Sequence, residues 1–184
     1  MRARQQRCVV LTMIKTSFAI LGLLLVSPCR AATAREYLSP DRSMVARAED
    51  KANGQVITIS SKNVAGVVCS LDLQGHSVIN GRPGDDGYAV MRATWTPDSK
   101  FFVFSTGSVG GHGPWHWPTY VYGVAVNRFL AIDDIAGPVG IPDFRIVGKH
   151  TLETATPDVG DPAEKISIDL SKAFTMKKKK WYEK

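Results

Sequence analysis

The chain has 184 residues, of which 44% are hydrophobic and 22% are charged, with 16 glycines and 10 prolines. This composition is typical of one globular domain and excludes a disordered, collagen-like or large multi-domain protein. Five of the 23 basic residues lie before residue 31, so 18 basic residues accompany the 17 acidic ones in the rest of the chain. A body so close to neutral lacks the broad basic surface of a nucleic-acid binder, and we expect no nucleic-acid partner.

The first 34 residues have the pattern of a secretory signal peptide. Lys15 precedes the apolar run Phe18–Val26, and the small residues Ala-Ala-Thr-Ala follow at 31–34. The run is too short to span a bilayer, which needs about 20 apolar residues. The pattern predicts export to the periplasm or the medium, with a mature chain that begins between residues 32 and 35.

Cysteine usage agrees with this reading. Cys8 and Cys29 belong to the leader, so the mature chain keeps Cys69 and no disulfide is expected. Lipid attachment at Cys29 is an alternative, although Pro28 departs from the small residue that a lipoprotein signal carries there. Cys69 lies in an apolar stretch, which predicts a buried, inert thiol.

After residue 43 the apolar residues form short runs separated by turn residues, a pattern typical of β-strands. The run Phe101–Phe104 and the segment Tyr120–Val126 are apolar on both sides, which places them at the centre of the sheets. Connections this short leave no room for crossover helices, so the sheets should be antiparallel. Ten strands are predicted: Met44–Ala48, Gln55–Ser61, Gly66–Leu73, Tyr88–Trp95, Phe101–Ser105, Thr119–Val126, Phe129–Ile132, Phe144–Val147, Leu152–Thr156 and Lys165–Leu170.

The chain also contains an internal repeat. Residues 39–46 (SPDRSMVA) align with residues 96–103 (TPDSKFFV) at a constant offset, and both copies place a Pro-Asp turn before an apolar strand. The second copy, with Trp95 in front of it, resembles the repeat of TolB-type β-propellers, in which a Trp-Ser-Pro-Asp-Gly turn opens a strand. Pro142-Asp143-Phe144 is interpreted as a third, degenerate opening.

The resemblance implies blade-like units, but some ten strands cannot form the four or more four-stranded blades of a closed propeller. We therefore predict one all-β domain over residues 35–175, a compact two-sheet arrangement of blade-like units. An open propeller fragment is the alternative. Residues 176–184 form a basic tail that is solvated or weakly contacts an anionic membrane surface through Lys177, Lys178, Lys179 and Lys180.

The candidate functional segment is the loop between the two strands of the second repeat. Residues 107–118 (GSVGGHGPWHWP) are longer than their counterpart and hold two of the four tryptophans and two of the four histidines. Long loops on a rigid β scaffold are where binding residues gather, and indole rings offer flat amphipathic surfaces. His112, Trp115, His116 and Trp117 are the predicted ligand-binding residues, with the competing interpretation that the tryptophans cap the core.

The same histidines raise an enzymatic alternative. His112 and His116 could serve a hydrolase or a metal centre if the fold brought Asp85 and Asp86, or Asp133 and Asp134, close to them. Gly113 and Pro114 exclude the helix of a zinc-protease motif, and the segment lacks a nucleophile elbow and a phosphate loop. We therefore predict no catalytic residues, metal or cofactor. The expected role is non-enzymatic binding of a protein or extracellular ligand, with a structural envelope component as a further alternative.

Overall fold

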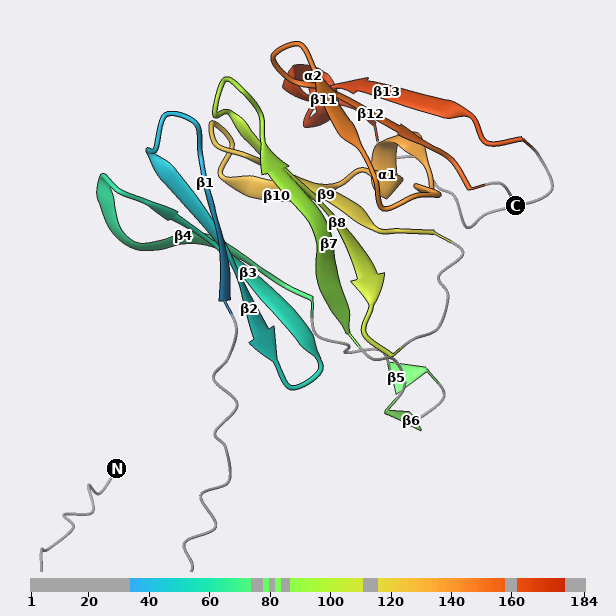
Figure 1. Ribbon diagram of the computed structural model, residues 1–184, viewed down its shortest axis with the longest axis horizontal. Helices are drawn as coiled ribbons and strands as arrows, with labels where there is room; N and C mark the ends of the chain where they lie inside the picture. Colours follow the sequence, from blue (N-terminus) through green and yellow to red (C-terminus); the bar gives the residue numbers. More distant parts are fainter. Residues whose placement is uncertain are drawn as a thin grey trace, which may run out of the picture. The chain divides into compact units, whose positions relative to one another are not determined.

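Segments in which apolar and polar side chains alternate form antiparallel β-sheets in a computed structural model (Figure 1). The structure describes residues 34–73, 78–79, 82–83, 87–110, 116–157 and 162–177. The first sheet holds, in spatial order, β1 (Ala34–Leu38), β2 (Met44–Lys51), β3 (Gly54–Ser61) and β4 (Val64–Asp72). The middle sheet holds β10 (Arg128–Ala131), β9 (Thr119–Gly123), β8 (Phe101–Ser108) and β7 (Tyr88–Trp95). The third sheet holds β11 (Arg145–Val147), β12 (Thr151–Ala155) and β13 (Lys165–Asp169).

Three smaller elements complete the described chain. A two-stranded ribbon, β5 (Val78–Ile79) with β6 (Arg82–Pro83), connects the first sheet to the middle sheet, and α1 (Asp133–Ala136) follows β10. The other single-turn helix, α2 (Leu170–Ala173), follows β13 and begins where the Asp169 side chain accepts a hydrogen bond from the Ser171 backbone N–H. Among the described residues no helix is long and apolar enough to cross a membrane.

The middle sheet lies between the other two because its strands are apolar on both faces. Phe102, Phe104 and Tyr122 are buried with the inward side chains of β2 and β3. Phe101, Val103 and Val121 are buried on the opposite face with residues of the third sheet and both helices. The three sheets thus stack face to face like successive blades, around two hydrophobic cores (Figure 1).

These observations confirm the prediction of an all-β, antiparallel domain of blade-like units. Phe101–Phe104 occupies the centre of the stack as expected, with all four side chains buried. The expected number of main sheets was wrong, since the described residues form a third one from β11, β12 and β13. The outward faces of the two end sheets carry cross-strand ion pairs such as Arg47 with Glu36 and Arg145 with Glu153.

The two copies of the repeat have the same turn geometry. Ser39 and Thr96 each donate a side-chain hydrogen bond of 2.7 Å to the aspartate two residues later. Their backbone N–H groups bond to the carbonyls of Met44 and Phe101, at 3.0 and 2.8 Å. Arg42 and Ser99 occupy the left-handed region with the same φ of 59°. The internal repeat is therefore a repeat of structure as well as of sequence.

These turns also connect neighbouring sheets. The Asp41 backbone N–H donates to Ser99 Oγ at 3.0 Å, which links the first turn to the second. The second turn is linked to the third sheet, because Asp98 Oδ2 lies 3.0 Å from His150 Nδ1. Burial alone would raise the pKa of Asp98, but hydrogen bonds with Thr96, His150 and the Lys100 backbone N–H lower it.

The position of His150 corrects the third repeat. Pro142-Asp143-Phe144 precedes β11, whereas the turn equivalent to 39–43 and 96–100 joins β11 to β12 at residues 148–150. Gly148 supplies the positive φ there, at 62°. The sequence interpretation was wrong because the third turn contains no Pro-Asp pair.

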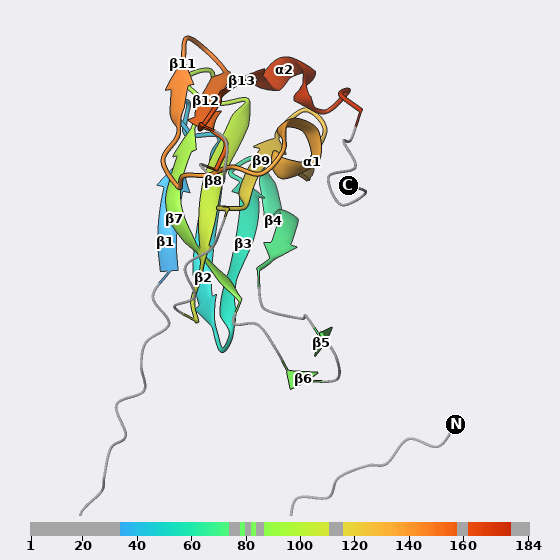
Figure 2. The same ribbon diagram turned by 90° about the vertical axis from the view of Figure 1, so that its right-hand side faces the viewer.

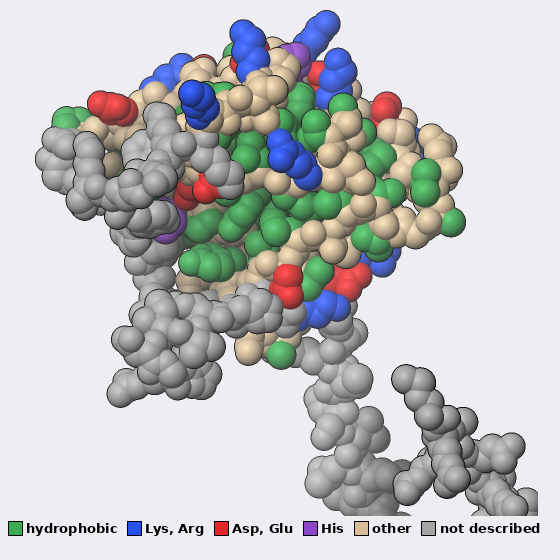
Figure 3. Space-filling view, turned by 180° about the vertical axis from the view of Figure 1, so that it is seen from behind, with side chains coloured by type: hydrophobic (Ala, Val, Ile, Leu, Met, Phe, Trp, Pro, Cys, Tyr) green, Lys and Arg blue, Asp and Glu red, His purple; other side chains and the backbone are tan. Residues whose placement is uncertain are grey.

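The first strands of the three sheets, β1, β7 and β11, are edge strands, and they lie on the same side of the stack (Figure 2). The opposite side is formed by the edges β4 and β10 and by the helices, and apolar side chains are exposed on it (Figure 3). Edge strands leave one side of their backbone outside a ladder, so both sides could accept a further strand. The two sides of the stack differ in how far other parts of the chain already cover the backbone of their edge strands.

Candidate functional site

The predicted loop is described only at its end. His112 and Trp115 lie outside the described residues, whereas His116 and Trp117 lead into β9. The Trp117 backbone N–H donates to the Val139 carbonyl at 2.7 Å, and its indole covers Gly107 of β8. A Cβ atom on Gly107 would stand 2.6 Å from Trp117 Cζ3, so a side chain at that position would displace the ring. Trp117 is half-buried and partly caps the middle sheet.

Met91 approaches the same point, because its Cγ and Sδ would stand 3.1 and 3.2 Å from that Cβ atom, so Trp117 and Met91 meet over Gly107. Met91 is the extra residue of a β-bulge in β7, where the register shifts between Val90 and Arg92. Its side chain is 54% exposed. The described end of the predicted loop therefore borders the edge of β7.

His116 contacts Asp133 at the start of α1. Its Nε2 lies 3.5 Å from Asp133 Oδ2, and the Thr119 backbone N–H donates to Asp133 Oδ1 at 3.3 Å. Burial lowers the pKa of His116, which favours the neutral imidazole. Burial also raises the pKa of Asp133 from 3.8 to about 6, against the Thr119 hydrogen bond and with a contribution from Asp134. The fold thus brings together one histidine and one carboxylate of the enzymatic alternative.

The raised pKa of Asp133 makes stability depend on pH. Between about pH 4 and pH 6 the unfolded carboxyl has already lost its proton, while the folded one still holds it. The folded state binds more protons there, so stability falls as the pH rises through this window and stays lower above it. At pH 7 the penalty is about 2–3 kcal/mol.

Asp133→Asn is therefore expected to raise the free energy of unfolding at pH 7 and to flatten its slope between pH 4 and 6. The amide oxygen can still accept the Thr119 hydrogen bond. Urea titrations of both proteins at pH 4, 5, 6 and 7 measure the effect. Asp143→Asn, which changes a side chain that is 77% exposed, serves as the comparison. Equal slopes in the wild type and Asp133→Asn would contradict the assignment.

Among the residues that the structure describes, no group of three His, Cys, Asp or Glu side chains could hold a metal ion. Cys69 is half-buried and faces inward beside Ile59. Burial raises the pKa of its thiol, against a backbone hydrogen bond from Ser70, and so disfavours the nucleophilic thiolate.

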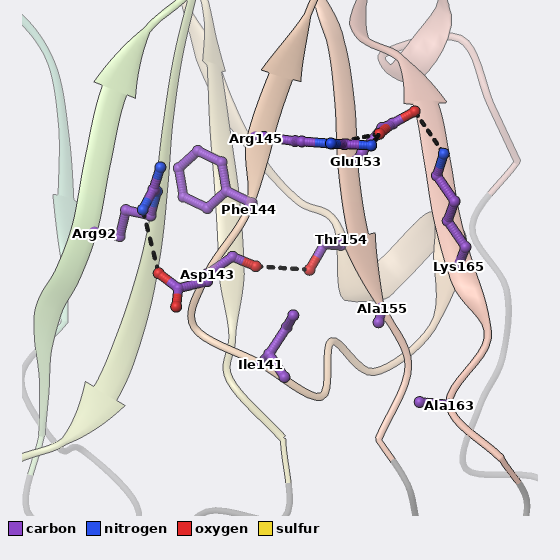
Figure 4. Close-up of a pocket in the computed structure, with 10 residues that line it drawn as sticks. All are labelled: Arg92, Ile141, Asp143, Phe144, Arg145, Glu153, Thr154, Ala155, Ala163 and Lys165. Atoms are coloured by element: carbon purple, nitrogen blue, oxygen red, sulfur yellow. Dashed lines mark hydrogen bonds and ion pairs between the residues drawn. The ribbon is translucent and has the colours of Figure 1, made fainter.

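A groove along β7 is the main concave feature that the sequence did not reveal. One hollow of about 670 Å³ lies between β7 and β11, and a second of about 510 Å³ continues it toward β12 and β13. The two are adjacent, because Arg92, Phe144 and Arg145 line both, and together they make up the groove; Figure 4 shows the second hollow. The first hollow is lined by Tyr37, residues 91–95, Pro97 and residues 144–146. The second is lined by the three shared residues and by Ile141, Asp143, residues 153–155, Ala163 and Lys165.

Arg92 forms the wall between the two hollows. Its Nη1 lies 3.2 Å from Asp143 Oδ1, and its guanidinium carbon lies 5.4 Å from the centre of the Phe144 ring. This cation–π contact holds the arginine stem over an apolar floor. The groove therefore combines aromatic surface with a charged group fixed at its middle.

A second charged cluster lies on the outward face of the third sheet, where it borders the second hollow. Glu153 accepts hydrogen bonds from Arg145 Nε at 2.7 Å and Nη2 at 2.6 Å, and its other oxygen lies 2.8 Å from Lys165 Nζ (Figure 4). The hydrogen bonds from Lys165 and then Arg145 hold the pKa of Glu153 below its usual value. The cluster spans three neighbouring strands, because Arg145 pairs with Glu153 across β11 and β12 and Lys165 begins β13.

Comparison with protein-family models found no match, and comparison with curated proteins found none. Among solved structures, the chain is similar to TolB from Acinetobacter baumannii, with 12% sequence identity and a TM-score of 0.40. The similarity covers 74% of this chain and 29% of the TolB chain, so this chain spans less than a third of that protein's length.

Proposed function

We propose that this chain is an exported, non-enzymatic binding domain that holds an extended segment of a protein partner in the groove along β7. The observation that carries the proposal is the continuity of the two hollows with an edge strand. An extended peptide can add to such an edge through its backbone, while its side chains enter neighbouring pockets. Export rests on the leader pattern of residues 1–34.

The groove has the length that an extended segment requires. The part of β7 and its turn that lines the groove runs from Met91 to Pro97, which corresponds to about 20 Å of extended chain. Trp95 and Phe144 give it a firm apolar floor, since both are at most 6% exposed. Ile141 and Met91 add exposed apolar surface at its margins, at 44% and 54%.

The edge of β7 is also better suited to this role than the edge of β4. The turn before β10 reaches β4, where Asn127 Nδ2 donates to the Val68 carbonyl at 3.2 Å. Along β7, the edge is covered at its beginning, where the Tyr88 N–H donates to the Leu73 carbonyl and the Val90 N–H to Gln55 Oε1, both at 2.8 Å. The segment after Val90 faces the groove.

The polar groups of the groove favour recognition over chemistry. Arg92 with Asp143 and the Arg145, Glu153 and Lys165 cluster are ion pairs, which orient a bound segment by its charges. The described end of the predicted loop lies beside this surface, because Trp117 and Met91 both approach Gly107.

A display library of random nine-residue peptides tests the proposal. Thr94→Trp fills the hollow beside β7, whereas Thr58→Trp makes the same change on the outward face of the first sheet. Peptides enriched on the wild type are expected to lose at least about tenfold in affinity for Thr94→Trp and to bind Thr58→Trp unchanged. The absence of enriched peptides, or equal binding to both variants, would refute the proposal.

A further inference from the structure

We infer that the groove selects a segment with an acidic side chain, and that Arg145 and Lys165 recognise its carboxylate. This inference rests on the proposed binding function and adds the chemistry of the partner. It is carried by the way in which the third sheet arranges three charges. Two cations, Arg145 and Lys165, share the single carboxylate of Glu153.

The exposed part of this cluster is positive. The side chains of Arg145 and Lys165 are 70% and 61% exposed, whereas that of Glu153 is 13% exposed. The carboxylate therefore lies beneath its partners, and an approaching molecule meets the two cationic groups first. A net charge of +1 remains at the surface after the three charges are combined.

The cations also keep hydrogen-bonding capacity. Glu153 engages Arg145 through Nε and Nη2 and Lys165 through one N–H. A guanidinium group has five N–H donors and an ammonium group has three, so several donors can turn toward a second carboxylate. The planar guanidinium is suited to bidentate recognition of that group.

The surroundings add an apolar contact. Ile141, Phe144, Ala155 and Ala163 line the same hollow, so the aliphatic part of an acidic side chain can pack there beside the two cations. The other charged group of the groove is less suitable, because Arg92 is paired one to one with Asp143, which is 77% exposed. A ligand carboxylate at Arg92 would meet that negative charge, so the acidic side chain is expected in the hollow of the third sheet.

The enriched peptides from the display library provide the test. We expect them to share an aspartate or glutamate at one position, and replacing it with the corresponding amide should weaken binding about five- to tenfold. Lys165→Gln should weaken binding of the acidic peptide by a similar factor and leave binding of the amide peptide unchanged. The reason is that the change in the protein and the change in the peptide remove the same interaction. Lys172→Gln is the matched control, since Lys172 is 77% exposed and lies outside the groove lining.

The outcomes separate this inference from the proposed function. The inference is overturned, and the binding function stays, if the peptides lose affinity for Thr94→Trp but share no acidic residue. The same conclusion follows if Lys165→Gln weakens the acidic peptide and its amide form equally. Peptides that ignore Thr94→Trp would overturn both. Thermal melts of Lys165→Gln and Arg145→Gln verify folding, and the second variant repeats the test from the other cation.

Discussion

Replacing Phe104 with alanine is expected to lower the free energy of unfolding by about 3–5 kcal/mol. Phe104 is fully buried at the centre of the middle sheet, between Phe102 and Tyr120, with ring centroids 5.6 and 5.3 Å away. Removing the ring loses the free energy gained by burying it away from water, and it leaves a cavity that a rigid sheet cannot close. The loss is a large part of the total stability of an ordinary domain.

Urea denaturation followed by circular dichroism measures this effect. Val126→Ala is the control, because Val126 is 46% exposed in the turn between β9 and β10 and should change stability by less than about 0.5 kcal/mol. If Phe104→Ala loses under 1 kcal/mol, or no more than the control, the placement of β8 between two cores is incorrect. If the variant does not fold, Phe104→Leu provides a measurable intermediate step.

Replacing Trp95 with alanine is expected to cost a similar amount, about 3–5 kcal/mol, for a second reason besides burial. Trp95 is 6% exposed, its ring centroid lies 5.2 Å from that of Phe102, and its Nε1–H donates to the Tyr37 carbonyl at 2.8 Å. The indole thus connects β7 of the middle sheet to β1 of the first sheet. The substitution removes both the packing and the connection.

Trp95→Phe separates these two contributions. Phenylalanine keeps most of the apolar contact and loses the hydrogen bond, so about 1–2 kcal/mol should be lost. Denaturant titrations of the two variants give the comparison. Equal losses in both variants would show that the hydrogen bond to Tyr37 dominates, and a loss below 1 kcal/mol in Trp95→Ala would contradict the position of Trp95 in the core.

Strand positions could be predicted because the strands alternate and are separated by strong turn residues. Tyr88–Trp95 agrees with β7 at both ends, and the other nine predicted strands each overlap an observed one. The first strand, Ala34–Leu38, was missed because its short sequence follows directly on the leader pattern. The single-turn helices α1 and α2 were missed because four residues cannot show a helical period.

The stacking of a third sheet and the groove could not be predicted in this way. The groove gathers Arg92, Phe144 and Lys165 from three separate parts of the chain, and their proximity depends on how the sheets stack. The Arg145 to Glu153 pair depends on the register of β11 and β12, which the sequence pattern leaves open. In contrast, the loop of His116 and Trp117 was visible as a composition signal, although its relation to β7 was not.

In the proposed complex, a partner segment lies along the edge of β7. Amide hydrogen exchange of the wild-type protein, with and without an enriched peptide, tests it most directly, because an added strand protects backbone N–H groups from solvent. We predict new protection within Met91–Trp95 and in β11, with no change in β4 or β10. Protection confined to β4 and β10, or none along β7 at saturating peptide, would contradict the account.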